Sequence, residues 1–290
     1  MLQLKRTDIN IRDPFILVED GKYYMYGTRG QTCWGKASGF DVYVSDNLET
    51  WSDPVPCFEN DGTFWADRNY WAPEVHVYEG KYYMFASFKS ETTCRGTAIL
   101  KSDTPLGPFV PHSDGCVTPS DWECLDGTFY VDKNGDPYMV FCHEWVQVGD
   151  GEICCVKLTK DLKKADGAPR LLFRASEAKW GKPVRHRSGI DGWVTDGPFM
   201  WRTDSGNLLC LWASFSEGGY TEAVAISDNG EIDGNFKQIE PLFMDDGGHG
   251  MVFKGLDGKM YLTLHSPNAH LEERPFFHEI IEENGTLRRL

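Results

Sequence analysis

Short apolar runs bounded by glycine, aspartate and asparagine recur along the whole chain. The runs KYYMYG, KYYMFAS, PYMVFC, NLLCLWAS and KMYLTLH are rich in aromatic or branched residues, and most follow turns such as EDGK, KNGD, DSGN and LDGK. Apolar runs of this length beside such turns predict β-hairpins, because glycine and asparagine tolerate positive φ. A helical period is weak throughout, so the pattern predicts an all-β protein.

Each apolar run belongs to a longer unit that occurs five times. The units open DPFILVEDGKYYMYGT, APEVHVYEGKYYMFAS, DGTFYVDKNGDPYMVFCHE, DGPFMWRTDSGNLLCLWAS and HGMVFKGLDGKMYLTLHS, at positions 13, 72, 126, 196 and 249. Further strand signals follow the opening hairpins of the units. Multi-strand units repeated at about 40–50 residues are typical of propeller blades. We therefore expect residues 1–290 to form one domain, a five-bladed β-propeller.

The composition limits the class of partner. The chain has 44 acidic and 29 basic residues, which give a net charge of −15. A surface that follows phosphate groups needs the opposite sign, so neither nucleic acid nor an anionic membrane is an expected partner, whereas a neutral ligand is not penalised. The composition does not predict the oligomeric state.

The cysteines indicate the compartment. The nine cysteines form no CxxC pair, HExxH is absent, and several cysteines lie in apolar strands, so a zinc site has little support. The start MLQLKRTDIN lacks an apolar leader, and no apolar run of 18 residues occurs. These features predict mostly reduced thiols and a cytoplasmic location.

Equivalent positions of all blades ring one central axis, so residues far apart in the chain are expected to meet at one mouth. The opening positions supply Asp13, Asp126, Asp196 and His249, with Ala72 in the second unit. The ends of the second strands supply Thr28, Arg29, Ser87, His143, Glu144, Ser214 and His265. Carboxyl groups that are close and partly desolvated have different pKa values, so one can act as an acid and another as a base. Hydrolysis of a glycosidic bond needs such a pair.

Five motifs in order carry a family resemblance. They are Arg12-Asp13-Pro14-Phe15, Trp71-Ala72-Pro73-Glu74, Leu125-Asp126-Gly127, Asp196-Gly197-Pro198 and Gly248-His249-Gly250. Over nearly the whole chain they resemble the motifs of family 43 glycoside hydrolases. The resemblance implies a five-bladed propeller that inverts the anomeric centre. It implies that Asp13 is the general base, and that Asp126 raises the pKa of the acid and orients it. It also implies that His249 is an axial histidine beside a calcium or other structural ion; no other cofactor is expected.

One motif departs from the family pattern. Asp196 stands where the family has a glutamate as general acid. Aspartate is one methylene shorter, so its reach falls by roughly 1.5 Å, one carbon–carbon bond. Three explanations remain open. Asp196 is the acid and its backbone lies further inward, which we favour; Glu144 supplies the acid; or the site binds sugar without hydrolysing it.

Six further residues are expected to contact substrate: Arg29, Trp71, Glu74, Trp145, His265 and Arg274. Trp71 and Trp145 could stack on a sugar ring, or pack between blades. Arg274 could pair with Asp126 or with a substrate hydroxyl, or form a surface ion pair. Glu74 could line the pocket, or cap a neighbouring loop.

The expected function is hydrolysis of a neutral oligosaccharide at its α-L-arabinofuranosyl, β-D-xylosyl or galactosyl ends. Exo action is expected because the long loop 174–193 and the segment around Trp34 could close one end of the channel. Two alternatives remain. One is a non-catalytic carbohydrate-binding propeller. The other is a glycoside phosphorylase, which needs a basic pocket where the rim offers few cations beyond Arg29 and Arg274.

Overall fold

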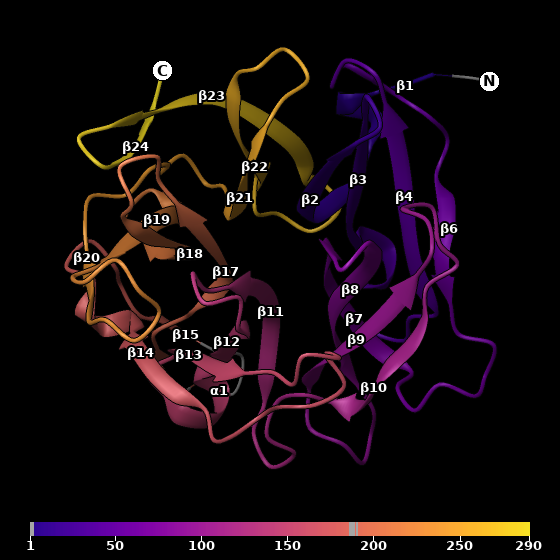
Figure 1. The fold of residues 1–290 in the computed structure, drawn as a ribbon, viewed down its shortest axis with the longest axis horizontal. Helices are drawn as coiled ribbons and strands as arrows, with labels where there is room; N and C mark the ends of the chain where they lie inside the picture. Colours follow the sequence, from indigo (N-terminus) through magenta and orange to yellow (C-terminus); the bar gives the residue numbers. More distant parts are fainter. Residues whose placement is uncertain (1–2, 186–188, 190) are drawn as a thin grey trace.

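Five antiparallel sheets of four strands stand around a central axis (Figure 1). The computed structural model describes residues 3–185, 189 and 191–290. The first strand of each sheet lies nearest the axis, and the later strands lie successively outward. The predicted all-β, five-bladed propeller is therefore confirmed.

The blades follow one another along the chain. Blade 1 contains β2 (Ile11–Glu19), β3 (Lys22–Arg29), β4 (Gly39–Ser45) and β6 (Val55–Glu59). Blade 2 contains β7 (Arg68–Tyr78), β8 (Lys81–Lys89), β9 (Gly96–Ser102) and β10 (Val110–Cys116). Blade 3 contains β11 (Cys124–Val131), β12 (Pro137–His143), β13 (Glu152–Lys157) and β14 (Arg170–Arg174). Blade 4 contains β17 (Asp196–Arg202), β18 (Leu208–Ser216), β19 (Gly219–Ser227) and β20 (Phe236–Gln238). Blade 5 contains β21 (Gly248–Lys254), β22 (Met260–Ser266), β23 (Arg274–Glu283) and β24 (Thr286–Arg289).

Short elements occupy the connections between the blade strands. β1 (Leu4–Lys5) pairs with β5 (Thr50–Trp51), and β15 (Val184–Arg185) pairs with β16 (Asp191–Gly192). The single α-helix among the described residues is α1 (Trp145–Val148), and 3₁₀ turns occupy Arg6–Asp8, Gly30–Thr32 and Ala175–Glu177. Residues 186–188 and 190 of the predicted loop 174–193 lie outside the described residues.

A bulge near the start of every innermost strand places one residue in the left-handed region of the backbone. These residues are Asp13 (φ 54°), Ala72 (φ 46°), Asp126 (φ 57°), Gly197 (φ 48°) and His249 (φ 56°). The fourth position belongs to Gly197, so the prediction that Asp196 is the equivalent of Asp13 was wrong by one residue. Glycine takes this conformation at least cost, and Pro198 then follows it as Pro14 follows Asp13.

Polar side chains at the ends of second strands bond to the bulge of the next blade. Thr28 Oγ1 accepts the N–H of Ala72 at 2.8 Å, Ser87 Oγ accepts that of Asp126 at 2.8 Å, and His265 Nδ1 accepts that of Asp13 at 3.1 Å. These three strand-end residues were predicted to line the mouth. Their side chains instead hold neighbouring blades together and fix the backbone of the bulges.

Blades 1 and 5 meet without sharing a strand, because each sheet takes its four strands from one stretch of chain. Polar contacts join them instead, between residues 6–12 and residues 273–275, and we call these residues the closing seam. Its bonds run from Arg12 Nη1 to Glu273 Oε1 (2.6 Å), Asn10 Nδ2 to Glu273 O (3.1 Å), Arg6 Nη1 to Pro275 O (2.7 Å) and Arg274 Nε to Thr7 O (2.8 Å). Glu273 is fully buried, which makes its pairing with Arg12 the most enclosed contact of the seam.

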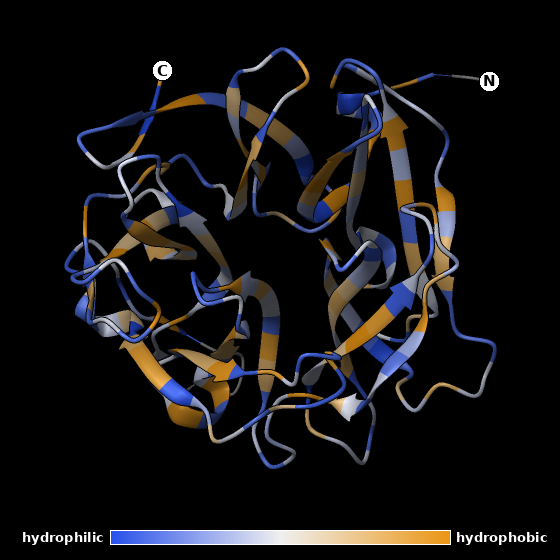
Figure 2. Ribbon diagram, viewed as in Figure 1, coloured by the Kyte–Doolittle hydropathy of each residue, from blue (hydrophilic) through white to orange (hydrophobic). Residues whose placement is uncertain are grey.

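Apolar residues lie along the strands, and polar residues collect in the turns (Figure 2). The largest buried side chains include Trp51, Trp212, Tyr26 and Phe85. All nine cysteines are free, in agreement with the expected reduced thiols. Of the helices described, none has the length and apolarity needed to cross a membrane. The cytoplasmic location stays a prediction.

Candidate active site

A cavity of about 700 Å³ opens where the innermost strands begin. The carboxyl groups of Asp13, Asp126 and Asp196 line it, together with the imidazole of His249. The structure therefore brings together four side chains from blades 1, 3, 4 and 5 that the repeat predicted to meet. Each comes from the bulge of an inner strand or from the residue before it.

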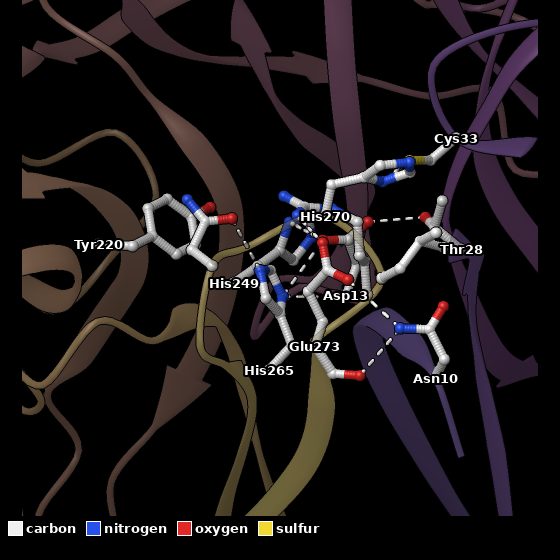
Figure 3. Close-up of polar contacts among 12 residues, drawn as sticks. Asn10, Asp13, Thr28, Cys33, Tyr220, His249, His265, His270 and Glu273 are labelled. Atoms are coloured by element: carbon white, nitrogen blue, oxygen red, sulfur yellow. Dashed lines mark hydrogen bonds and ion pairs between the residues drawn. The ribbon is translucent and has the colours of Figure 1, made fainter. Parts of the chain in front are cut away.

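The carboxylate of Asp13 contacts side chains of blades 1 and 5 (Figure 3). Thr28 Oγ1 donates to Asp13 Oδ2 at 2.6 Å, and His249 Nδ1 lies 3.1 Å from Asp13 Oδ1. Burial would raise the pKa of Asp13, but the charge and hydrogen bond of His249 and the charge of Arg12 outweigh it and hold the pKa well below its usual range. Asp13 is therefore ionised, which is the state that a general base must have before the reaction.

His249 lies between two carboxyl groups. Its Nδ1 is 3.1 Å from Asp13 Oδ1 and 3.7 Å from Asp126 Oδ2. Burial would lower the pKa of His249, but the charges of Asp13 and Asp126 raise it to about 10. The imidazole is therefore a buried cation that balances the carboxylates around it.

The pKa values of Asp126 and Asp196 are raised, whereas that of Asp13 is lowered. Burial raises the pKa of Asp196 to about 6 and that of Asp126 to about 7, against the attraction of His249. The N–H of Gly197 donates to Asp126 Oδ2 at 3.1 Å, and the hydroxyl of Tyr220 donates to Asp196 Oδ2 at 3.1 Å. The pair thus retains a proton near neutral pH, while Asp13 on the same cavity does not.

Glu144 also lines the cavity, but its carboxylate is already engaged. It forms an ion pair with the buried Arg95, whose guanidinium lies 4.0 Å from the ring centroid of Trp71. A carboxylate that accepts from a guanidinium is occupied as an acceptor. This geometry weighs against the alternative in which Glu144 supplies the proton.

The predicted substrate contacts divide into two groups. Trp71, in β7 of blade 2, and Trp145, in α1 of blade 3, both line the cavity. Arg29 does not reach it, because its guanidinium is held by Asp41 at 2.7 Å and Glu59 at 2.5 Å.

Three more predicted contacts also lie outside the cavity lining. Glu74 is buried within β7 and lies 2.9 Å from Nε2 of His76. Arg274 donates to the carbonyl groups of Thr7 and Glu273 rather than to Asp126. His265 is fully buried behind Asp13, as Figure 3 shows. Arg274 and His265 thus bond to residues 7 and 13 at the junction of blades 5 and 1, whereas Glu74 pairs within its own strand.

Sequence reasoning missed several residues of the cavity, which are Arg12, Trp34, Tyr220, Asn268 and His270. Arg12 precedes Asp13 inside a recognised motif, so its position was a usable signal. Tyr220 lies at the start of a third strand, where no motif marks it.

The residues around His249 were tested for the ion that the resemblance implies. Calcium takes roughly six to eight oxygen ligands in proteins. Here Nδ1 of His249 faces two carboxyl groups, and the described residues contain no group of three or more His, Cys, Asp or Glu side chains arranged to hold a metal. They do not build a calcium cage, so the ion stays a prediction and no catalytic step is assigned to it.

Comparison with known proteins gives a consistent result. The model of "Glycosyl hydrolases family 43" matches residues 8–280. A solved endo-arabinase from Bacteroides thetaiotaomicron VPI-5482 is 42% identical, with a TM-score of 0.91 over 98% of this chain and 99% of that one.

Curated relatives match less of the sequence. Extracellular endo-α-(1→5)-L-arabinanase 1 of Bacillus subtilis (strain 168) is 27% identical over 171 residues, 54% of this chain and 49% of that protein. A β-xylosidase of Xylanibacter ruminicola is 26% identical over 241 residues, 68% of this chain and 73% of that protein. The matches span about half the length of several curated relatives.

Proposed function

We propose, from the premise that this chain belongs to family 43 of the glycosyl hydrolases, that it hydrolyses α-L-arabinofuranosyl linkages of neutral oligosaccharides with inversion. Arabinose is our first choice because the relatives named above include an endo-arabinase and an arabinanase. A β-D-xylosyl linkage is the alternative, since another relative is named a β-xylosidase. We retain action at chain ends as part of the proposal.

The proposed reaction is a single displacement. Asp13 takes a proton from water while the water oxygen bonds to the anomeric carbon. Asp196 gives its proton to the glycosidic oxygen as the bond between that oxygen and the anomeric carbon breaks. The water attacks the face opposite the leaving group, so the anomeric configuration inverts. Asp126 is proposed to orient Asp196 and to support its protonated form. The charge of Asp196 raises the pKa of Asp126, because neighbouring carboxyl groups resist ionising together.

One observation carries the proposal: Asp13 and Asp196 line the same cavity, and their surroundings shift their pKa values in opposite directions. Asp13 is ionised, and Asp196 has a raised pKa. An inverting hydrolase needs a base and an acid in these states at the same pH.

The test is hydrolysis of aryl arabinofuranoside, xyloside and galactoside, and of matching disaccharides, by the wild type and by Asp13→Asn, Asp196→Asn and Glu144→Gln. We expect Asp13→Asn to abolish turnover on every substrate. Because aryl groups leave with little help from an acid, Asp196→Asn should lose far more activity on the disaccharide. A larger loss for Glu144→Gln would transfer the acid role to Glu144.

The products decide the remaining points. The anomer formed first, observed by NMR, tests inversion, and release of monosaccharide from a longer oligosaccharide tests action at chain ends. Sugar binding without turnover would support the carbohydrate-binding alternative. Phosphorolysis has no specific support, because Arg12 and Arg185, which line the cavity, pair with Glu273 at 2.6 Å and Asp191 at 3.6 Å.

A further inference from the structure

Trp34 is a large apolar side chain that is exposed to solvent at the edge of the cavity. It follows the 3₁₀ turn Gly30–Thr32, lines the cavity, and is 60% exposed. Burying such a side chain is favourable by about 25 cal/mol per Å² of apolar area. An indole that the fold leaves uncovered beside the proposed reaction centre is therefore available to a ligand.

The segment that carries Trp34 is fixed on blade 2. The N–H of Asn69 donates to the carbonyl of Gly35 at 3.0 Å, and its side-chain amide donates to the carbonyl of Cys33 at 3.2 Å. The indole N–H of Trp71 donates to the same Cys33 carbonyl at 2.5 Å. The backbone is thus bonded on both sides of Trp34, which holds the indole in place before any ligand binds.

Two ring contacts fix the orientation of the indole. The ring of Trp34 meets that of Trp71 edge-on, with centroids 5.5 Å apart and planes at 74°. The guanidinium of Arg12 lies 5.5 Å from the centroid of the Trp34 ring. Ligand binding therefore costs little conformational entropy at this side chain.

Arg12 connects Trp34 with the reaction centre. Its guanidinium lies against the Trp34 ring and bonds to Glu273 in the closing seam, and it directly precedes Asp13 in the chain. Arg12, Asp13 and Trp34 line the same cavity. An oligosaccharide whose reacting sugar lies at Asp13 can therefore extend toward Trp34 within that cavity.

We propose that Trp34 is the platform of a subsite for the sugar unit adjacent to the one that reacts, and that it binds the apolar face of a neutral pentose ring. The inference rests on the proposed function and extends it to a requirement for longer substrates. A sugar ring offers C–H groups on one face, and a flat indole is suited to pack against them. The cavity, at about 700 Å³, falls within the range of pockets that take ligands larger than one sugar ring.

The experiment compares Trp34→Ala with the wild type on a methyl glycoside and on an oligosaccharide series of two to five units. A disaccharide already fills the adjacent position, so we expect kcat/KM on every oligosaccharide to fall about tenfold or more, mainly through a higher KM. The methyl glycoside, whose leaving group is too small to cover the indole, should change less than twofold. Trp34→Phe, which keeps a flat ring, should recover much of the loss.

Leu256→Ala is the matched control, because Leu256 is an exposed apolar residue of blade 5 outside the cavity lining. It should leave both substrate classes unchanged. An equal loss on the methyl glycoside and on the oligosaccharides, or no loss on either, contradicts the proposal that Trp34 binds the adjacent sugar. If the wild type cleaves none of the sugars, the proposed function fails separately. Calorimetry with the same series then decides, since equal affinities of wild type and Trp34→Ala also overturn the platform.

Discussion

The two aspartates proposed as base and acid have the same side chain, and their neighbours separate their ionisation. Asp13 faces His249, Arg12 and the hydroxyl of Thr28, which all favour the carboxylate. Asp196 is buried against a tyrosine hydroxyl, and desolvation dominates. The family motifs were enough to find both residues. Their states depend on partners from other blades, which no local pattern specifies.

The raised pKa of Asp196 predicts an alkaline limit to activity. As proposed acid it must carry a proton, so kcat/KM on a natural disaccharide should fall as pH rises through about 6.

The control for this pH profile is an aryl substrate with a good leaving group. On this substrate the fall of kcat/KM with rising pH should be weak. A disaccharide profile that stays flat from pH 5 to 8 contradicts the assignment of Asp196 as acid.

Glu222 predicts a pH dependence of stability rather than of activity. It is fully buried in β19, and its Oε2 accepts the N–H of Gly250 at 2.8 Å. Burial raises the pKa of Glu222 to about 8, so above the ordinary pKa of a glutamate the folded protein must keep a proton that the unfolded chain releases, and this costs folding energy. The cost is absent at pH 4, grows as pH rises toward 8, and is then constant.

Glu222→Gln keeps the shape without the charge. We expect its free energy of unfolding to exceed that of the wild type by roughly 1–3 kcal/mol at pH 8, and by much less at pH 5. Denaturant unfolding at both pH values measures this. A difference that does not change with pH would show that the carboxyl is not protonated in the fold.

At the level of strands, the sequence predicted the repeating hairpins. It did not predict which residue of the blade 4 bulge takes the left-handed conformation. Asp-Gly-Pro in blade 4 fits the motif pattern with either Asp196 or Gly197 at the left-handed position. The structure selects Gly197, whose φ is 48°. The shift of one residue changes where the side chain of Asp196 leaves the strand. It accompanies the replacement of the family's glutamate by a shorter aspartate.

The bulge of blade 4 should not tolerate a side chain. A Cβ on Gly197 would lie 2.6 Å from Cγ and Cδ2 of His249, and its φ is already unfavourable for alanine. Gly197→Ala is expected to cost roughly 1–3 kcal/mol of stability from backbone strain alone, with a further loss of kcat because His249 must move. Thermal unfolding and steady-state kinetics measure the two effects.

Gly135→Ala is the matched control, because Gly135 also has a positive φ (79°) but has open space around it. It should lose stability through strain and keep its kcat. Equal kcat values for both variants would mean that the contact with His249 does not matter for the reaction.

For the whole molecule, blade number and order were predictable because each blade repeats one pattern within one stretch of chain. The way the ring closes was not predictable, because the seam consists of side-chain contacts between residues 6–12 and 273–275 that follow no repeat. Glu273 follows the last recognised strand and shows no motif. Only the closed ring brings it against Arg12.

Glu273→Gln tests the seam. Removing the charge leaves the Arg12 guanidinium, 14% exposed, with Asp13 as its remaining anionic neighbour, and we expect a loss of about 1.5–3 kcal/mol in the free energy of unfolding. Glu279→Gln is the control on the strand that follows Glu273, since Glu279 pairs with Lys259 at 2.6 Å but is 38% exposed. Exposed pairs contribute about 0–1 kcal/mol. Similar losses for both variants would show that the Arg12–Glu273 pair contributes no more to the free energy of unfolding than an exposed ion pair does.

The closing seam also contains the residue next to the proposed base. Arg12 pairs with Glu273 across the junction, and the amide of Asp13 bonds to His265 of blade 5. A small parting of the first and last blades would separate these groups while every sheet kept its own ladder of hydrogen bonds. Turnover therefore serves as a gauge of ring integrity. On heating, the protein should cease to be a catalyst before it ceases to be a propeller.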